Sequence, residues 1–174
     1  TPVDLRGTRS KAERAAQRSS RVPERGIGGT MFDAAMLTPD ERAALAEALD
    51  DEFHAWAIYD QVVHDLGAGP PFTHIRGAES RHIEALLRLY RRYGLEVPSN
   101  PWVGRVERFA SVHDACQAAV ASEVSNAALY DRLLARTRRA DLRRVFQNLR
   151  RASQQNHLPA FRRCLARERS GLLR

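Results

Sequence analysis

The segment FTHIRGAESRHIEALLRLYRRY, residues 72–93, decides the fold. At helical spacing its apolar side chains form one stripe, and Glu79 and His82 interrupt that stripe. Gly94, which follows directly, is a typical helix stop. The segment therefore predicts an amphipathic helix whose buried face carries a carboxylate and an imidazole.

Three other segments have the same helical period. The sequence TPDE at 38–41 supplies an N-cap, a proline at the first helical position and a capping-box glutamate. Ser111 is the expected cap of a later helix, and Pro159 is expected to kink the last one. The predicted helices span residues 38–66, 72–93, 111–136 and 141–169.

The connections between these helices are short, long and short in turn. The long connection, over 95–110, contains two prolines, and we expect one helical turn near 103–109. Because no segment alternates with period two, we expect an all-α chain. Four helices with a single long crossover between the second and third predict a ferritin-like four-helix bundle rather than a simple up-and-down one.

Composition divides the chain into three regions. Residues 1–37 have few large apolar side chains and carry glycine breakers within 26–29, which predicts a flexible basic N-terminal tail. Residues 38–169 form the predicted bundle, and residues 170–174 form a short C-terminal tail. Because no apolar run approaches the roughly 18–20 residues of a membrane span, we expect no transmembrane segment.

Charge is distributed unevenly along the chain. It carries 28 Lys and Arg against 21 Asp and Glu, for a formal net charge of +7. Residues 36–131 hold eight arginines and fifteen acids, a balance of −7, whereas residues 132–174 hold thirteen arginines and two acids, a balance of +11. The asymmetry indicates an acidic site in one part and an anion-attracting surface in another.

Each predicted helix carries ionisable groups on its buried stripe. These groups are Glu52, Glu79, His82, Glu123 and His157. The two short helix connections set the levels of the paired helices, so we expect all five side chains to converge in one layer. Three buried carboxylates repel one another and cost several kcal/mol unless they are paired. A divalent metal ion removes that cost, and we therefore predict these five residues as metal ligands.

These residues resemble those of the ferritin-like superfamily, in particular its rubrerythrin branch. There, each half of the bundle offers a glutamate on one helix and Glu-x-x-His on the next, and a tyrosine often follows the glutamate by seven residues. Here Tyr59 follows Glu52, and Tyr130 follows Glu123, at that offset. The segments 51–60, 78–94 and 148–161 look most like an uncharacterised prokaryotic ferritin-like family. The resemblance covers residues 38–168 and implies a metal-binding bundle, usually with iron, but no known reaction.

One position departs from the family pattern. The second Glu-x-x-His would need a glutamate at position 154, but this chain has Gln154 there, with Ser153 on the stripe itself. Four glutamates would neutralise two divalent ions, whereas three leave the pair at +1. The chain could therefore bind a weak second metal ion, use an external anion as a bridge, or hold one ion on Glu52, Glu79 and His82. These alternatives stay open, and the sequence also leaves open whether Gln154 or Ser153 lines the site.

Aromatic residues and cysteines lie near the predicted ligands. The candidates for a redox-active shell around the metal, with ordinary core packing as the alternative, are Trp56, Tyr59 and Tyr130. Cys116 and Cys164 lie two helical turns from Glu123 and His157, at the same expected height. A disulfide and a pair of buried thiols are both open. A disulfide would favour an extracytoplasmic protein, and free thiols a cytoplasmic one.

The predicted function is a non-haem metal-binding protein, with iron as the expected metal and zinc, manganese or copper as alternatives. It would react with dioxygen or peroxide as an oxidoreductase, or it would handle metal ions. The expected partners are metal ions, and a homodimer is left open. The alternative is a helical protein that binds nucleic acid or an anionic surface through arginine pairs on its last helix, with a structural metal or none.

Overall fold

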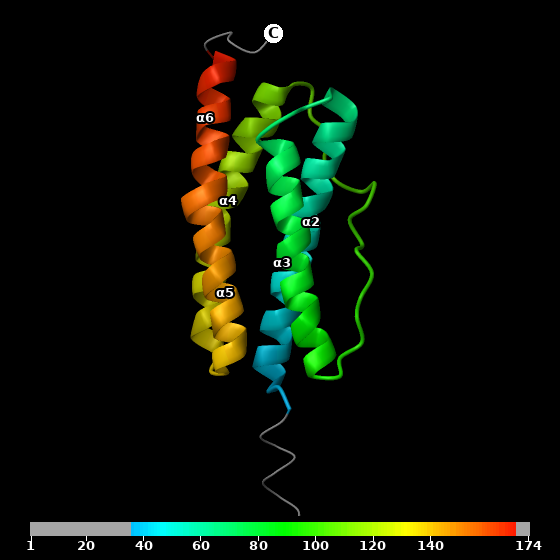
Figure 1. Ribbon diagram of the computed structural model, residues 1–174, viewed down its shortest axis with the longest axis vertical. Helices are drawn as coiled ribbons and strands as arrows, with labels where there is room; N and C mark the ends of the chain where they lie inside the picture. Colours follow the sequence, from blue (N-terminus) through cyan, green and yellow to red (C-terminus); the bar gives the residue numbers. More distant parts are fainter. Residues whose placement is uncertain (1–35, 170–174) are drawn as a thin grey trace, which may run out of the picture. The chain divides into compact units, whose positions relative to one another are not determined.

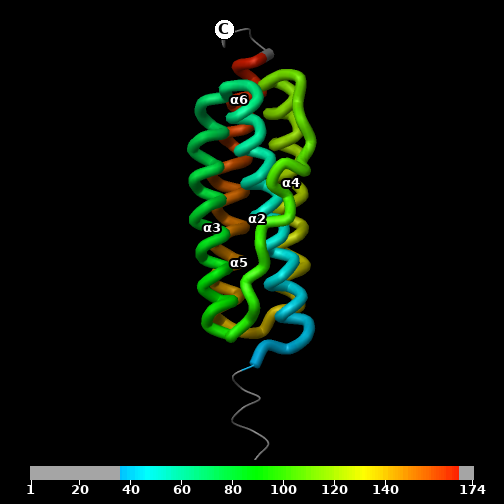
Figure 2. The backbone as a smooth tube through the Cα atoms, turned by 90° about the vertical axis from the view of Figure 1, so that its right-hand side faces the viewer, coloured from blue at the N-terminus to red at the C-terminus, as the bar shows by residue number. Residues whose placement is uncertain are grey.

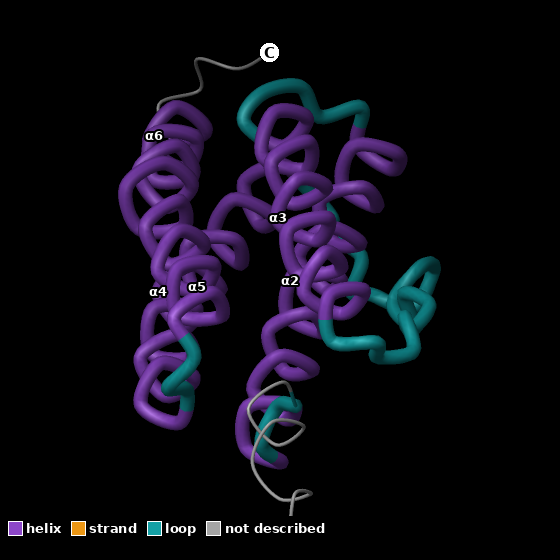
Figure 3. Tube along the Cα trace, turned by 60° about the horizontal axis from the view of Figure 1, so that its bottom comes forward, coloured by secondary structure: helices purple, strands orange, loops and turns teal. Residues whose placement is uncertain are grey.

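The computed structural model describes residues 36–169, and these residues are helical without any strand. The helices are α2 (Pro39–Leu66), α3 (Phe72–Arg92), α4 (Val112–Arg136), α5 (Ala140–Ala152) and α6 (Leu158–Arg169), with a π-helical segment, η2 (Ser153–His157), between α5 and α6. Figure 3 shows these helices and the loops that join them. The all-α prediction is confirmed for this part of the chain. Residues 1–35 of the predicted N-terminal tail (1–37) and the predicted C-terminal tail (170–174) lie outside the described residues.

The helices lie side by side, as Figures 1 and 2 show. α2 packs against α3 and α4, and the α5–α6 rod packs mainly against α4, with α5 also touching α3. α3 and α4 run in the same direction, so the long segment between them returns from the end of α3 to the start of α4, and it lies beside α2 on the way (Figure 1). Every helix therefore has antiparallel neighbours, and the predicted long crossover between the second and third helices is present.

The helix ends follow the local signals in the sequence. The Thr38 hydroxyl accepts a hydrogen bond from the Glu41 N–H at 3.1 Å, and the Glu41 carboxylate accepts one from the Thr38 N–H at 3.2 Å, which completes the capping box. α2 ends at Gly67, whose φ of 60° lies in the left-handed region that glycine adopts at little cost. Ser111 caps α4 by accepting from the Asp114 N–H at 3.1 Å.

Two details differ from the sequence-based expectations. Leu37, which we assigned to the tail, is buried in the apolar core, so packing begins one residue before the helix cap. The expected helical turn near 103–109 is instead a four-residue turn, closed by a hydrogen bond from the Arg105 N–H to the Trp102 carbonyl. Gly104 at its third position has a φ of 71°, which a right-handed helical turn does not allow.

A π-helical segment ends two residues before Pro159, the position of the predicted kink. The Leu158 N–H donates to the Ser153 carbonyl, five residues earlier. In a regular α-helix the proline ring would clash with the carbonyl four residues before it, and the wider π turn avoids that contact. The segment supplies two buried polar residues, Ser153 and His157.

A polar layer divides the apolar core into two clusters. One cluster contains Leu49 and Leu86, and the other contains Tyr59 and Ile75, so Glu52 on α2 and Glu79 on α3 each lie between the two. α4 and the α5–α6 rod repeat this order, with Glu123 on α4 and Ser153 and His157 of η2 between the two clusters. The polar layer therefore has apolar side chains on both sides of it along the helix axes.

Cys116 on α4 and Cys164 on α6 form a disulfide, with 6.2 Å between their Cα atoms. Both side chains are buried in the cluster that contains Tyr59. The bond fixes α4 to α6 at one end of the helices and resolves the alternative that the sequence left open. Among the described residues, no helix is long and apolar enough to cross a membrane.

At the opposite end, the Glu41 carboxylate joins the start of α2 to the turn between α4 and α5. It accepts hydrogen bonds from the backbone N–H groups of Arg138 (3.1 Å) and Arg139 (3.0 Å). Replacing Glu41 with alanine removes a charged acceptor from both part-buried N–H groups and breaks the capping box, so we expect the free energy of unfolding in urea to fall by about 2–3 kcal/mol. Glu47→Ala, which breaks only exposed ion pairs, should cost at most about 1 kcal/mol. Equal losses would contradict this role for Glu41.

Candidate metal centre

The five predicted ligands surround one small cavity at the middle of the helices. They come from four different elements, and the set is Glu52 of α2, Glu79 and His82 of α3, Glu123 of α4 and His157 of η2. The cavity has a volume of about 10 Å³, which is the space of one water-sized body. The three glutamates and His157 are each at most 4% exposed. The structure therefore brings together every residue that the buried stripes predicted.

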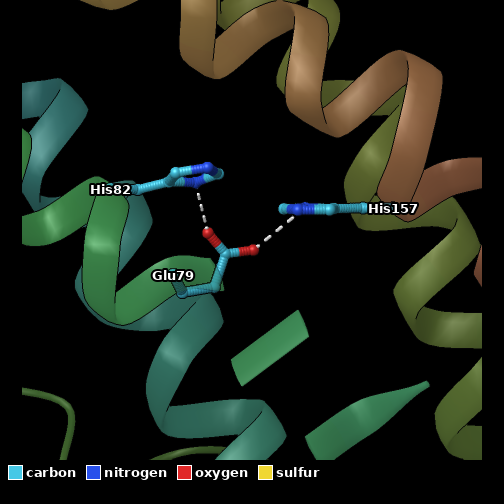
Figure 4. A group of neighbouring side chains, drawn as sticks. All are labelled: Glu79, His82 and His157. Atoms are coloured by element: carbon cyan, nitrogen blue, oxygen red, sulfur yellow. Dashed lines mark hydrogen bonds and ion pairs between the residues drawn. The ribbon is translucent and has the colours of Figure 1, made fainter. Parts of the chain in front are cut away.

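Glu79 lies between the two imidazoles, as Figure 4 shows. Its Oε2 accepts a hydrogen bond from His82 Nδ1 at 2.7 Å, and its Oε1 is 3.2 Å from His157 Nδ1. The two rings are nearly parallel, with centroids 5.4 Å apart. Glu52 and Glu123 flank this group: Glu52 Oε2 is 3.1 Å from His82 Nδ1, and Glu123 Oε1 is 3.4 Å from His157 Nδ1.

Two buried tyrosines orient the flanking carboxylates, each across the helix pair. The Tyr59 hydroxyl on α2 donates to Glu123 Oε1 on α4 at 2.9 Å, and the Tyr130 hydroxyl on α4 donates to Glu52 Oε1 on α2 at 2.5 Å. Burial raises the pKa of both tyrosines, and the neighbouring carboxylates raise it further. Both hydroxyls therefore stay protonated and donate at neutral pH. The seven-residue offset predicted nearby tyrosines but not this exchange of partners.

Ser153, rather than Gln154, lines the cavity. The Ser153 hydroxyl donates to the Glu123 carboxylate. Gln154 Nε2 instead donates to the backbone carbonyl of Glu123 at 2.6 Å and to Ser153 Oγ at 3.1 Å. The amide at position 154 thus supports the hydroxyl and the helix backbone, and the position gives the cavity no fourth glutamate.

Burial and hydrogen bonding shift the pKa values of these groups strongly. Burial lowers the pKa of His82, but hydrogen bonds to Glu52 and Glu79 outweigh burial and raise it to about 10. For His157, hydrogen bonds to Glu123 and Glu79 likewise overcome burial and raise the pKa to about 9. Burial and the charge of Glu79 raise the pKa of Glu52, whereas the hydrogen bonds from both histidines overcome burial and lower the pKa of Glu79. Without metal, two imidazolium ions therefore offset two of the three buried negative charges, and the raised pKa of Glu52 favours its uncharged form.

The donor set fits a divalent transition-metal ion. Imidazole nitrogen and carboxylate oxygen are common ligands of iron, zinc, manganese and copper. One donor atom from each of Glu79, His82 and His157 lies within 4.8 Å of the other two. Two ligands on one ion at roughly 2.0–2.2 Å each are at most about 4.4 Å apart. Small side-chain movements would bring these atoms onto a shared cation, and the cation would then replace the imidazolium protons.

Two residues in the cavity wall, Asp51 and Asn126, were not predicted as site residues. Asn126 Nδ2 donates to Asp51 Oδ2 at 2.8 Å. Burial raises the pKa of Asp51 to about 6, and the charges of Glu79 and Glu123 add to this effect, while the Asn126 hydrogen bond opposes it. Asp51 lies about 100° from Glu52 around the helix, so the stripe pattern left it out. The run of three acidic residues at 50–52 was the sequence feature that could have pointed to Asp51.

Trp56, the third predicted aromatic residue, lies outside the cavity wall. Its indole N–H donates to Ser80 Oγ at 2.9 Å, which links α2 to α3. The redox role suggested for Trp56, Tyr59 and Tyr130 stays a prediction. The two tyrosines contact candidate ligands directly, whereas Trp56 is bonded only to the neighbouring helix.

No protein-family model and no curated protein matches this sequence. Among solved structures, the chain is similar to a hypothetical protein from Methanococcus jannaschii, with a TM-score of 0.68 and 22% sequence identity. The match covers 76% of this chain and 83% of that chain. At this level of identity the similarity shows a shared fold alone.

The metal-free protein should lose stability as the pH rises. In the folded chain the pKa values of His82 and His157 are about 10 and 9, above the ordinary value of about 6.5. Their contribution is therefore fully present below about pH 6.5 and is lost as the pH rises through 9 to 10. The raised pKa of Glu52 has the same sign. Urea unfolding in a chelator should show a falling free energy of unfolding from pH 6.5 to 10.

The double variant His82→Gln, His157→Gln is the control for this pH dependence. It keeps hydrogen-bonding side chains at both positions but removes both titrating imidazoles, so its stability should fall less over the same pH range and retain only the contribution of Glu52. A variant as pH-dependent as the parent protein would show that other groups cause the loss.

Proposed function

We propose that this chain is a ferritin-like, non-haem metal-binding protein that uses iron to react with dioxygen or peroxide, or that handles metal ions. The observation that carries the proposal is the position of Glu79: its two oxygens face His82 and His157 inside a buried cavity. Two further glutamates, Glu52 and Glu123, flank the same cavity. A cation at the centre of this group would offset the free-energy cost of burying so many charged side chains.

Bound iron would supply electron transfer to dioxygen or peroxide. The residues of the chain would hold and shield that ion. Glu79, His82 and His157 would bind it, and the hydroxyls of Tyr59 and Tyr130 would keep the flanking carboxylates oriented toward it. The apolar clusters above and below the layer would keep bulk water from the site.

The disulfide between Cys116 and Cys164 supports an extracytoplasmic location for the protein. Disulfides form and persist mainly in oxidising compartments, whereas cytosolic thiols are kept reduced. An iron site in such a compartment would meet oxidants directly.

The anion-binding alternative has weaker support, because parts of the basic C-terminal stretch are used within the fold. Arg143 donates to the carbonyls of Leu134 and Thr137 at 2.6 and 2.8 Å, and Arg150 pairs with Asp131 at 2.9 Å. These arginines close the turn between α4 and α5 and join those two helices. Their positive charge therefore has a structural use that needs no external anion.

Metal content is the test of the proposed function. Purified protein incubated with Fe²⁺ under anaerobic conditions should retain the metal after gel filtration, as measured by elemental analysis. Glu79→Gln removes the charge between the two imidazoles and should abolish retention. Glu84→Gln makes the same change at an exposed position of α3 and should bind like the parent protein. A parent protein without bound metal, or unchanged retention in Glu79→Gln, would overturn the proposal.

Oxidation of the bound ion separates a reactive site from a structural one. Protein loaded with Fe²⁺ should consume dioxygen or peroxide faster than the same concentration of Fe²⁺ in buffer. A protein that retains zinc but leaves Fe²⁺ oxidation unchanged would instead hold a structural metal.

A further inference from the structure

A polar groove on the surface adjoins the buried cavity. It lies between α2 and α4, beside Trp102 of the crossover, and its lining includes Glu47, Asp50, Asp51, Ser122, Asn126 and Arg132. Three of these residues, Asp51, Ser122 and Asn126, also line the cavity. They therefore form the wall that separates the groove from the candidate metal ligands.

The pair in this wall offers oxygen atoms suited to a cation. Asn126 Nδ2 donates a hydrogen bond to Asp51 Oδ2 at 2.8 Å. In this orientation the amide oxygen of Asn126 points away from that hydrogen bond. Asn126 Oδ1 is buried and has no hydrogen-bond partner. A buried amide oxygen without a donor normally costs free energy. Carboxylate and amide oxygens are common ligands of divalent cations, so a passing cation would satisfy this atom.

The lining of the groove holds three carboxylates and one arginine, even though the whole chain is basic. Glu47 pairs with Arg132 at 3.1 Å and with Arg136 at 2.5 Å, whereas Asp50 accepts a hydrogen bond from the uncharged indole N–H of Trp102 at 2.9 Å. With Asp51, the groove has an excess of negative charge next to the buried site. Such a cleft concentrates cations at its mouth.

We infer that divalent metal ions reach the buried centre through this groove, and that the oxygens of Asp51 and Asn126 receive the ion before it passes to Glu52 and Glu79. The inference rests on the proposed metal-binding function and adds the route of uptake. Asp51 therefore controls the rate of loading, whereas the five ligands control how much metal is held. A substitution of Asp51 should therefore change the rate of metal uptake, whereas a substitution of a ligand should change the amount of metal bound.

Asp51→Asn tests the charge at the wall. The new amide oxygen can still accept from Asn126 Nδ2, and the side chain keeps its size, so the variant should fold normally. Stopped-flow mixing with Co²⁺, followed by its visible absorption, should show uptake slowed by about tenfold or more, with the final stoichiometry unchanged. Asp60→Asn makes the same change on α2, at a residue that lines neither groove nor cavity, and should load at the parent rate.

Ser122→Phe tests the route by size instead of charge. Ser122 is exposed and lines both spaces, so a phenyl ring there should block the groove and slow Co²⁺ uptake to a similar extent. Ala121→Phe places the same ring at the adjacent exposed position, which lines neither space, and should leave the rate unchanged.

The outcomes separate this inference from the proposed function. Slower loading at full stoichiometry in Asp51→Asn and Ser122→Phe, with both controls unaffected, supports the route. Parent-like loading in these two variants overturns it while the metal-binding function stands. A lower stoichiometry in Asp51→Asn also overturns it, because Asp51 would then be a ligand. A parent protein that takes up no Co²⁺ or Fe²⁺ overturns the proposed function and the route together.

Discussion

Three glutamates buried at one level of an apolar core are the constraint on which the rest of this structure depends. An unpaired carboxylate in such a place costs several kcal/mol. Glu79 meets this cost by facing two imidazolium groups, and the outer glutamates accept from tyrosine hydroxyls. These partners come from different helices, so the charge layer fixes the helices relative to one another. The same layer is the candidate metal centre.

The structure on both sides of the layer isolates it. One apolar cluster extends toward the turn where Glu41 joins α2 to the α4–α5 connection, and the other surrounds the Cys116–Cys164 disulfide. Sliding one helix against its neighbour would separate the carboxylates from their hydroxyl and imidazole partners. The disulfide at one end and the hydrogen bonds of Glu41 at the other hold the helix ends together and oppose this sliding. On the side that carries Asp51 and Asn126, the wall of the cavity is shared with a surface groove.

Much of the candidate site could be predicted because helical periodicity and short connections carry three-dimensional information. An acid on an apolar stripe must face the core, and a short turn sets the level of the next helix. Those two rules brought Glu52 to Glu79 and Glu123 to His157. They could not choose between Ser153 and Gln154, because the π-helical segment alters which side chains face inward. They also left out Asp51, since the wall between two packed helices extends beyond either stripe.

The sequence by itself determined the helices, their caps and the residues that are buried with charge, because capping boxes, glycine stops and apolar stripes act within one or two turns. Only the tertiary structure decided which partners those charges have. The exchange of tyrosines between α2 and α4, the amide oxygen of Asn126 left unpaired beside Asp51, and the disulfide each depend on distances between segments far apart in the chain. Such distances follow from how four helical faces pack together, and no single stripe contains that information.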